Sequence, residues 1–132
     1  MSEFSKQMKI VLIINMIVGL VYGIIYAFFP EGLSSLNDAP YFDPHFWRLF
    51  GAILIAIGIV VLLGILNGDW DHVKLLYQFA ILVLFGFAIV NLTSNIYLIR
   101  SATNLIFHLF DTIVILLLLV FDLFFYVREE KK

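Results

Sequence analysis

Four apolar segments of this chain are each long enough to cross a lipid bilayer. They run over about residues 8–29, 44–66, 73–99 and 103–127, and a spanning helix needs about 20 apolar residues. Hydrophobic residues make up 63% of the 132 residues and charged residues 14%, whereas globular chains have about 45–50% and 25%. A soluble domain of this length cannot bury so much apolar surface. The sequence therefore predicts one all-α domain over residues 1–132, an integral membrane four-helix bundle.

The distribution of lysine and arginine predicts the orientation of the bundle, because cytoplasmic loops carry an excess of both. With the amino terminus inside, the outer side receives only Arg48 and Arg100. The cytoplasmic side receives the other six, which are Lys6, Lys9, Lys74, Arg128, Lys131 and Lys132. We therefore expect a multi-pass protein of the cell membrane, up-down-up-down, with both termini cytoplasmic and the segment 30–43 outside.

The outer segment 30–43 contains signals for the end of one helix and the start of the next. Pro30 is expected to end the first helix because it lacks an amide hydrogen. Asp43 followed by Pro44 is typical of an N-cap and a first helical position. The neighbouring aromatic residues predict an interfacial belt, with a lid over a pocket as the alternative: Tyr41, Phe42, Phe46 and Trp47.

Small residues recur at intervals of four in the first span, at Gly19, Gly23 and Ala27, in line with Asn15. Small residues at this spacing let two helices approach closely. We expect them to pack within the bundle, and a homodimer interface is the alternative. In the second span, Arg48 shares one side with small residues that include Gly51 and Gly58, which predicts that Arg48 points toward the packed side.

The fourth span contains three residues that are costly in hydrocarbon, His108, Asp111 and Asp122. A carboxylate at the bilayer centre costs about 2.5–3.5 kcal/mol on insertion scales. Together with Ser101 and Asn104, these residues project within about a third of the helix circumference. A polar stripe on one side of a membrane helix is expected to face the bundle interior, where partners exist.

The outer half of the third span is also polar and should adjoin this stripe, because the two helices are joined at their outer ends. It contains Asn91, Thr93, Ser94 and Asn95. Arg48 lies about 6 Å into its helix and Asp111 about 10 Å beyond Asn104. These depths predict a buried ion pair between Arg48 and Asp111, with His108, Asn91 and Asn95 hydrogen-bonded around it. Asp122 is expected to reach interfacial water or Lys74.

Two interpretations of this cluster stay open, a structural network that fixes helix register and a ligand-binding pocket in the outer half. For the pocket, an amphiphile such as a lipid or a quinone is expected to contact Arg48, Asn91, Asn95, Asn104, His108 and Asp111. The alternative function is a membrane enzyme in which His108 and Asp111 perform acid–base chemistry on an apolar substrate.

Several classes of site and partner are not indicated by the sequence. The net charge of −2 does not favour nucleic-acid binding, and the absence of cysteine removes thiolate metal sites and iron–sulfur clusters. A metal site from His45, His108 and Asp111 lacks typical ligand spacing. We therefore predict no cofactor and no metal. Membrane lipid, an amphiphilic small molecule, a partner subunit or a second copy of the chain are the expected partners.

Two stretches, "FFPEGL" and "FWRLFGAILIAIGIVVLLG", followed by Asp111 in the last span, resemble the DoxX-like group of small four-helix membrane proteins. The resemblance rests on the "FFP" that ends the first helix, on Arg48 followed by Gly51 and Gly58, and on Asp111. Many members of this broad group have unknown functions. The named DoxX proteins are similar to subunits of a thiosulfate–quinone oxidoreductase, which implies a partner subunit and quinone contact. This chain departs from that function in having no cysteine or redox motif.

Overall fold

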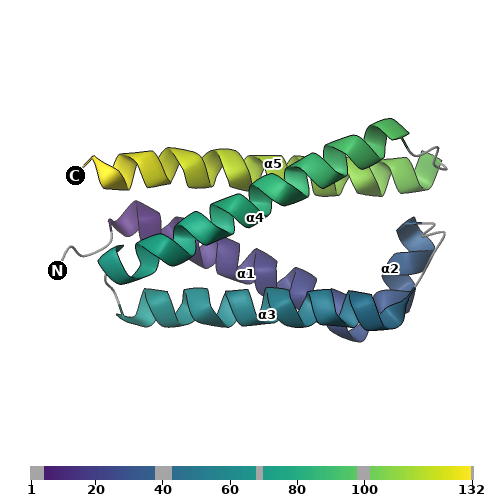
Figure 1. Ribbon diagram of the computed structural model, residues 1–132, viewed down its shortest axis with the longest axis horizontal. Helices are drawn as coiled ribbons and strands as arrows, with labels where there is room; N and C mark the ends of the chain where they lie inside the picture. Colours follow the sequence, from purple (N-terminus) through teal and green to yellow (C-terminus); the bar gives the residue numbers. More distant parts are fainter. Residues whose placement is uncertain (1–4, 38–42, 68–69, 98–101, 132) are drawn as a thin grey trace.

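The computed structural model describes residues 5–37, 43–67, 70–97 and 102–131, and these residues are almost entirely helical (Figure 1). Four helices are long, namely α1 (Lys6–Phe28), α3 (Pro44–Asn67), α4 (Trp70–Tyr97) and α5 (Ala102–Glu130). The described residues contain no strand. The predicted all-α class is confirmed, and each long helix covers most of one of the four predicted spans.

Each long helix is apolar enough to cross a membrane. The candidate spans are Lys6–Phe28, Pro44–Leu66, Val73–Ser94 and Leu105–Glu130. Large apolar side chains lie exposed along all four helices, which is the arrangement expected when the surrounding solvent is lipid instead of water. The protein is therefore a small multi-pass membrane protein.

Successive long helices run in opposite directions, and the start of α1 lies at the same end of the bundle as the end of α5 (Figure 1). Hydrogen bonds join these two ends. Ser5 donates to Glu129 through its main-chain nitrogen (3.0 Å to Oε1) and through its hydroxyl (2.8 Å to Oε2). Which end of the bundle faces the cytoplasm stays a prediction from the basic residues.

We expect this shared end to be cytoplasmic, because five of the eight basic residues lie there within the described residues: Lys6, Lys9, Lys74, Arg128 and Lys131. A protease-sensitive tag added after Lys132 should be protected in right-side-out vesicles and digested after the vesicles are opened. The same tag on a periplasmic or secreted reporter domain, digested in intact vesicles, serves as the control. Digestion of the terminal tag from outside would reverse the orientation.

A short helix, α2 (Pro30–Asn37), follows α1 directly and was not predicted from the sequence. Pro30 ends α1, as expected, but it also occupies the first position of α2, where proline is favourable because no amide partner is needed. At the next helix start, Asp43 Oδ1 accepts a hydrogen bond from the main-chain nitrogen of His45 (2.9 Å). The predicted cap of α3 at Asp43 is confirmed. The aromatic belt stays a prediction, and two of its four residues, Tyr41 and Phe42, lie outside the described residues.

Helices α1 and α3 pack backbone to backbone along a glycine seam, formed by Gly23 and Ala27 of α1 and Gly51 of α3. A Cβ atom on Gly51 would lie 2.4 Å from the main-chain nitrogen of Ala27 and 2.7 Å from the carbonyl oxygen of Gly23. Such close approach is possible only where side chains are minimal. The prediction that these small residues pack within the bundle is confirmed.

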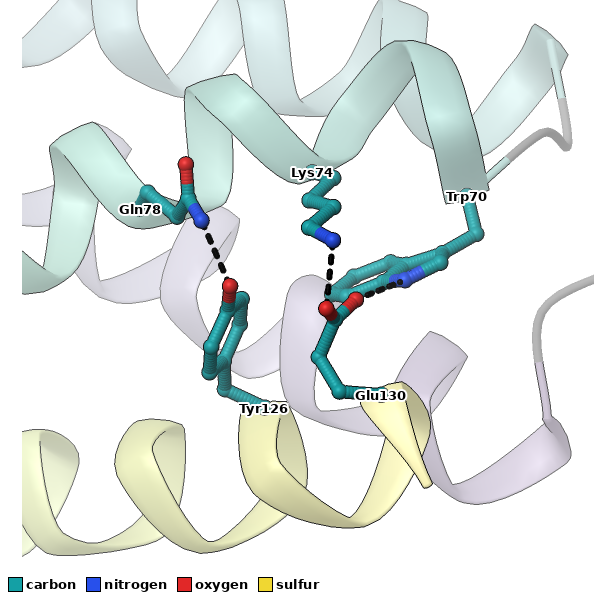
Figure 2. Close-up of polar contacts among 5 residues, drawn as sticks. All are labelled: Trp70, Lys74, Gln78, Tyr126 and Glu130. Carbon is teal, nitrogen blue, oxygen red and sulfur yellow. Dashed lines mark hydrogen bonds and ion pairs between the residues drawn. The ribbon is translucent and has the colours of Figure 1, made fainter. Parts of the chain in front are cut away.

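Helices α4 and α5 are joined by polar side chains at the end of the bundle that holds the termini (Figure 2). Glu130 pairs with Lys74 and accepts a hydrogen bond from Trp70 Nε1 (3.0 Å). One turn further along, Gln78 Nε2 donates to the hydroxyl of Tyr126 (2.5 Å). Each contact crosses from α4 to α5, so this end of the helix pair is held by polar contacts as well as by apolar packing.

Candidate functional site

The bundle consists of two helix pairs with a cavity between them. Helix α1 packs mainly against α3, and α4 against α5, whereas direct contact between the two pairs is sparse. The resulting cavity has a volume of about 730 Å³ and is lined by side chains from all four long helices. This volume lies within the range of about 300–1,000 Å³ that is usual for small-molecule sites.

A carboxylate lies in the wall of this cavity. Asp111 of α5 is partly exposed to it, and its Oδ1 atom accepts a hydrogen bond from the hydroxyl of Tyr22 in α1 (2.8 Å). This bond crosses from one helix pair to the other. A carboxylate within a membrane needs hydrogen-bond donors or a positive charge nearby, and Tyr22 supplies one donor. The second carboxylate oxygen takes no hydrogen bond from the described residues and is available to a ligand.

Aromatic rings form the wall next to this carboxylate. The ring of Tyr26 lies 6.4 Å from that of Tyr22, 5.4 Å from that of Trp47 and 5.1 Å from that of Phe50, measured between centroids. Phe50 in turn meets Phe87 of α4 edge-on at 5.4 Å. All five rings line the cavity, and we call them the aromatic wall. Its electron-rich faces and few hydroxyl groups suit the polar end of an amphiphile.

Two further polar side chains border the same end of the cavity. His108 of α5 lines it, and the Nδ1 atom of its imidazole is buried without a hydrogen-bond partner among the described residues. Asn91 of α4 donates from Nδ2 to the main-chain oxygen of Phe87 (3.1 Å), which leaves its amide oxygen as an acceptor. The described part of the chain contains no group of three histidine, aspartate or glutamate residues placed to hold a metal.

Apart from Asn15, the remainder of the cavity is apolar and extends toward the end of the bundle that holds the termini. Between Trp47 and Val61, the lining residues of α3 cover about 20 Å along the helix axis. The other helices add mostly aliphatic side chains at this depth, such as Leu84 and Leu118. The cavity therefore has a polar end and a long apolar extension, which is the shape of an amphiphile.

A second carboxyl group is fully buried in α5, between the large cavity and the end of the bundle that holds the termini. Asp122 has 0% of its surface exposed, and its Oδ1 atom accepts hydrogen bonds from Asn15 Nδ2 (2.6 Å) and from the hydroxyl of Tyr77 (2.9 Å). Its Oδ2 atom is buried with no partner in the described residues. The prediction that Asp122 reaches interfacial water or Lys74 is wrong, because Asp122 is fully buried, Lys74 pairs with Glu130, and α1 supplies the amide of Asn15 as the partner of Asp122.

A smaller cavity of about 430 Å³ lies between α1 and α5 beside Asp122. Its lining is apolar except for Gln7, Asn15 and Asp122, and it shares Asn15, Val114 and Leu118 with the larger cavity. The Asn15 side chain therefore stands in the partition between the two cavities. From this position Asn15 donates its hydrogen bond to Asp122.

The predicted ion pair between Arg48 and Asp111 is wrong. Arg48 Nη2 instead contacts Glu31 Oε1 at 3.2 Å, and the two side chains are 56% and 60% exposed. The predicted orientation of Arg48 toward the packed side is wrong for the same reason. The unpredicted helix α2 brings Glu31 next to the start of α3, where the pair keeps its contact with solvent and avoids the cost of burying two charges.

The six predicted ligand-binding residues are distributed as follows. His108, Asp111 and Asn91 line the large cavity together, and Arg48 does not line it. The side chains of Asn95 and Asn104 lie outside the described part of the structure. Sequence reasoning missed the cavity residues Asn15, Tyr22 and Tyr26, although "NMIVGLVYGIIY" contained a signal. These three polar side chains recur at intervals of seven and four, on one face of α1.

Comparison of the full chain with protein families, with curated proteins and with solved structures finds no match.

Proposed function

We propose that this protein binds an amphiphilic molecule in the cavity between its two helix pairs. The observation that carries the proposal is the combination of size and lining: about 730 Å³, with a polar end at Asp111 and His108 and an apolar extension that reaches Val61 and Leu118. Ligand sites are usually apolar cavities with a few polar groups that fix orientation. Ionisable residues inside a membrane protein are, in addition, candidates for function by default.

The cavity lining also sets the orientation of the ligand. Its polar head would lie against Asp111 and the aromatic wall, at the end of the bundle near α2. Its apolar tail would extend between the aliphatic side chains toward Leu84 and Leu118. With the termini in the cytoplasm, the head would lie in the outer half of the membrane.

Acid–base catalysis by His108 and Asp111 acting together is supported less well. The group that donates to Asp111 is the hydroxyl of Tyr22, and the described contacts of His108 include none to Asp111. An accessory role in a membrane complex rests on the resemblance to the DoxX-like group. Its test is whether the protein purifies alone or with a partner subunit after gentle extraction.

Filling the apolar extension should prevent binding without changing the polar end. We expect Leu84→Trp, which places an indole in the cavity, to weaken the binding of the amphiphile at least about tenfold, a loss of about 1.4 kcal/mol of binding energy. The matched control is Leu82→Trp, because Leu82 lies on the same helix with 68% of its surface exposed. Native mass spectrometry from detergent micelles measures the bound molecule directly.

Two results would contradict the proposed function. One is the absence of any co-purified or added amphiphile near stoichiometric amounts in the wild-type protein. The other is equal retention by Leu84→Trp and Leu82→Trp in proteins with the same melting behaviour, which would place the bound molecule outside the cavity.

A further inference from the structure

The carboxylate in the large cavity has no positively charged partner among the described residues. No lysine or arginine contributes to the described lining of the cavity. Arg48 is engaged by Glu31 and Lys74 by Glu130, and both ion pairs lie away from the cavity. The titratable side chains that line the cavity with Asp111 are the phenols of Tyr22 and Tyr26 on α1 and the imidazole of His108, which precedes Asp111 by three residues on α5. A ligand is therefore the natural source of the missing positive charge.

The aromatic wall stands directly beside this carboxylate. Tyr22 is both the hydrogen-bond donor to Asp111 (2.8 Å) and the first ring of the wall, 6.4 Å from Tyr26. Trp47 and Phe50 pack against Tyr26 at 5.4 and 5.1 Å, at tilted and edge-on angles, so that the rings do not form one flat stack. Tryptophan and tyrosine faces within about 6 Å attract a cation through the ring quadrupole, and clustered rings of this kind recognise alkylammonium groups.

We propose that the ligand is a cationic alkylammonium amphiphile, with its ammonium head between Asp111 and the aromatic wall and its alkyl chain in the apolar extension. This proposal rests on the proposed function, since it names the chemical class that the same cavity binds. The carboxylate balances the charge of the head, and the rings of Tyr26 and Trp47 contact its alkyl groups. The ammonium head loses its contact with water, but the carboxylate and the aromatic faces replace the lost hydration.

A zwitterionic phospholipid also has an ammonium group, but it fits this lining less well. Its phosphate would enter the same end of the cavity as Asp111, where no described lysine or arginine lines the wall to accept it. Like charges close together in a site of low polarity are unfavourable. A free alkylammonium carries one positive charge and nothing negative, so it matches the single carboxylate.

Three probes with the same alkyl chain test the charge of the head: dodecyltrimethylammonium, dodecanol and dodecylphosphocholine. Equilibrium dialysis of each radiolabelled probe against the protein in maltoside micelles, with empty micelles as the reference, measures saturable binding. We expect the ammonium probe to bind at least about tenfold more tightly than either other probe, a difference of about 1.4 kcal/mol.

Matched variants test the assignment to Asp111. Asp111→Asn keeps the acceptor for Tyr22 but removes the charge, and we expect it to weaken ammonium binding at least about tenfold while dodecanol binding is unchanged. Asp122→Asn is the control, because it alters a fully buried carboxyl group on the same helix that does not line the large cavity. Should Asp111→Asn fail to fold, Tyr26→Leu removes a central ring of the aromatic wall and should selectively weaken ammonium binding.

The outcomes separate this proposal from the one on which it rests. If dodecanol binds as tightly as the ammonium probe, or if Asp111→Asn and Tyr26→Leu leave the ammonium affinity unchanged, the cavity binds amphiphiles without regard to charge and the alkylammonium assignment is overturned. If dodecylphosphocholine binds as tightly, the site accepts a zwitterionic lipid head and the assignment to a free alkylammonium is overturned. If none of the three binds saturably, the proposed function fails as well.

Discussion

Replacing Gly51 with alanine is expected to separate α1 from α3 and to lower the free energy of unfolding by about 3 kcal/mol or more, the upper part of the range for overpacked sites. The added Cβ would lie 2.4 Å from the main-chain nitrogen of Ala27 and 2.9 Å from its Cα. A flexible side chain could rotate away from such an atom, but the backbone of a helix cannot. The helices must therefore move apart along the glycine seam. Unfolding in mixed micelles of increasing dodecyl sulfate content measures the loss.

Gly86→Ala is the matched control for this experiment. Gly86 is also a glycine in the middle of a spanning helix, but a Cβ atom there would meet nothing within 4 Å. Alanine favours helix over glycine by about 1 kcal/mol, so this variant should be neutral or slightly more stable. Equal stability of Gly51→Ala and Gly86→Ala would show that α1 and α3 do not pack along the glycine seam in the membrane protein.

Asp122→Leu is expected to have the second large effect. The change removes the acceptor for two buried donors, the amide of Asn15 and the hydroxyl of Tyr77. Each buried donor left without a partner costs about 1–3 kcal/mol, so the sum is about 2–6 kcal/mol. We expect a value at the low end of this range, because both donors keep a main-chain acceptor: Asn15 also donates to the oxygen of Val11 (3.2 Å) and Tyr77 to that of residue 122 (3.3 Å). The titration with dodecyl sulfate described for Gly51→Ala also measures this loss in the free energy of unfolding.

The conservative variant Asp122→Asn tests whether one side-chain oxygen is enough at this position or whether both carboxyl oxygens are needed. Asparagine keeps a side-chain oxygen for both donors and removes only the carboxyl character, so we expect most of the stability to be retained. If Asp122→Asn is as damaging as Asp122→Leu, the second carboxyl oxygen is essential and binds a donor or a cation. If Asp122→Leu is tolerated, the hydrogen bonds from Asn15 and Tyr77 do not contribute to stability.

The four spans could be predicted from the sequence because their signal is local. Apolar length alone defines a membrane helix, and the Asp43–Pro44 pair placed the start of α3 correctly. The helix α2 was missed because its eight residues, "PEGLSSLN", are too short and too polar to show an apolar period. That single omission also removed Glu31 from consideration as a partner of Arg48.

The partners of the buried carboxyl groups could not be predicted, because each partner comes from a helix distant in the sequence. The spacing of His108 and Asp111 indicated a shared polar face, and both residues line the large cavity. Nothing in that spacing selects Tyr22, which lies 89 residues before Asp111. Similarly, the depth of Asp122 suggested the interface, whereas the crossing of α1 and α5 brings Asn15 to it from 107 residues away. Helix rotation and tilt decide these contacts, and they depend on packing between helices.

The glycine seam also has a consequence for the order in which the protein is assembled. Both of its surfaces belong to the first 67 residues, so they leave the ribosome before α4 and α5 do. Chains fold from the amino terminus as they are made, and α1 can therefore dock on α3 while the second half is still under construction. The large cavity forms only when α4 and α5 insert beside the pair of α1 and α3. A substitution in the glycine seam therefore affects the first step of assembly, the docking of α1 on α3. A substitution at Asp111 affects the bundle only after both helix pairs are in the membrane.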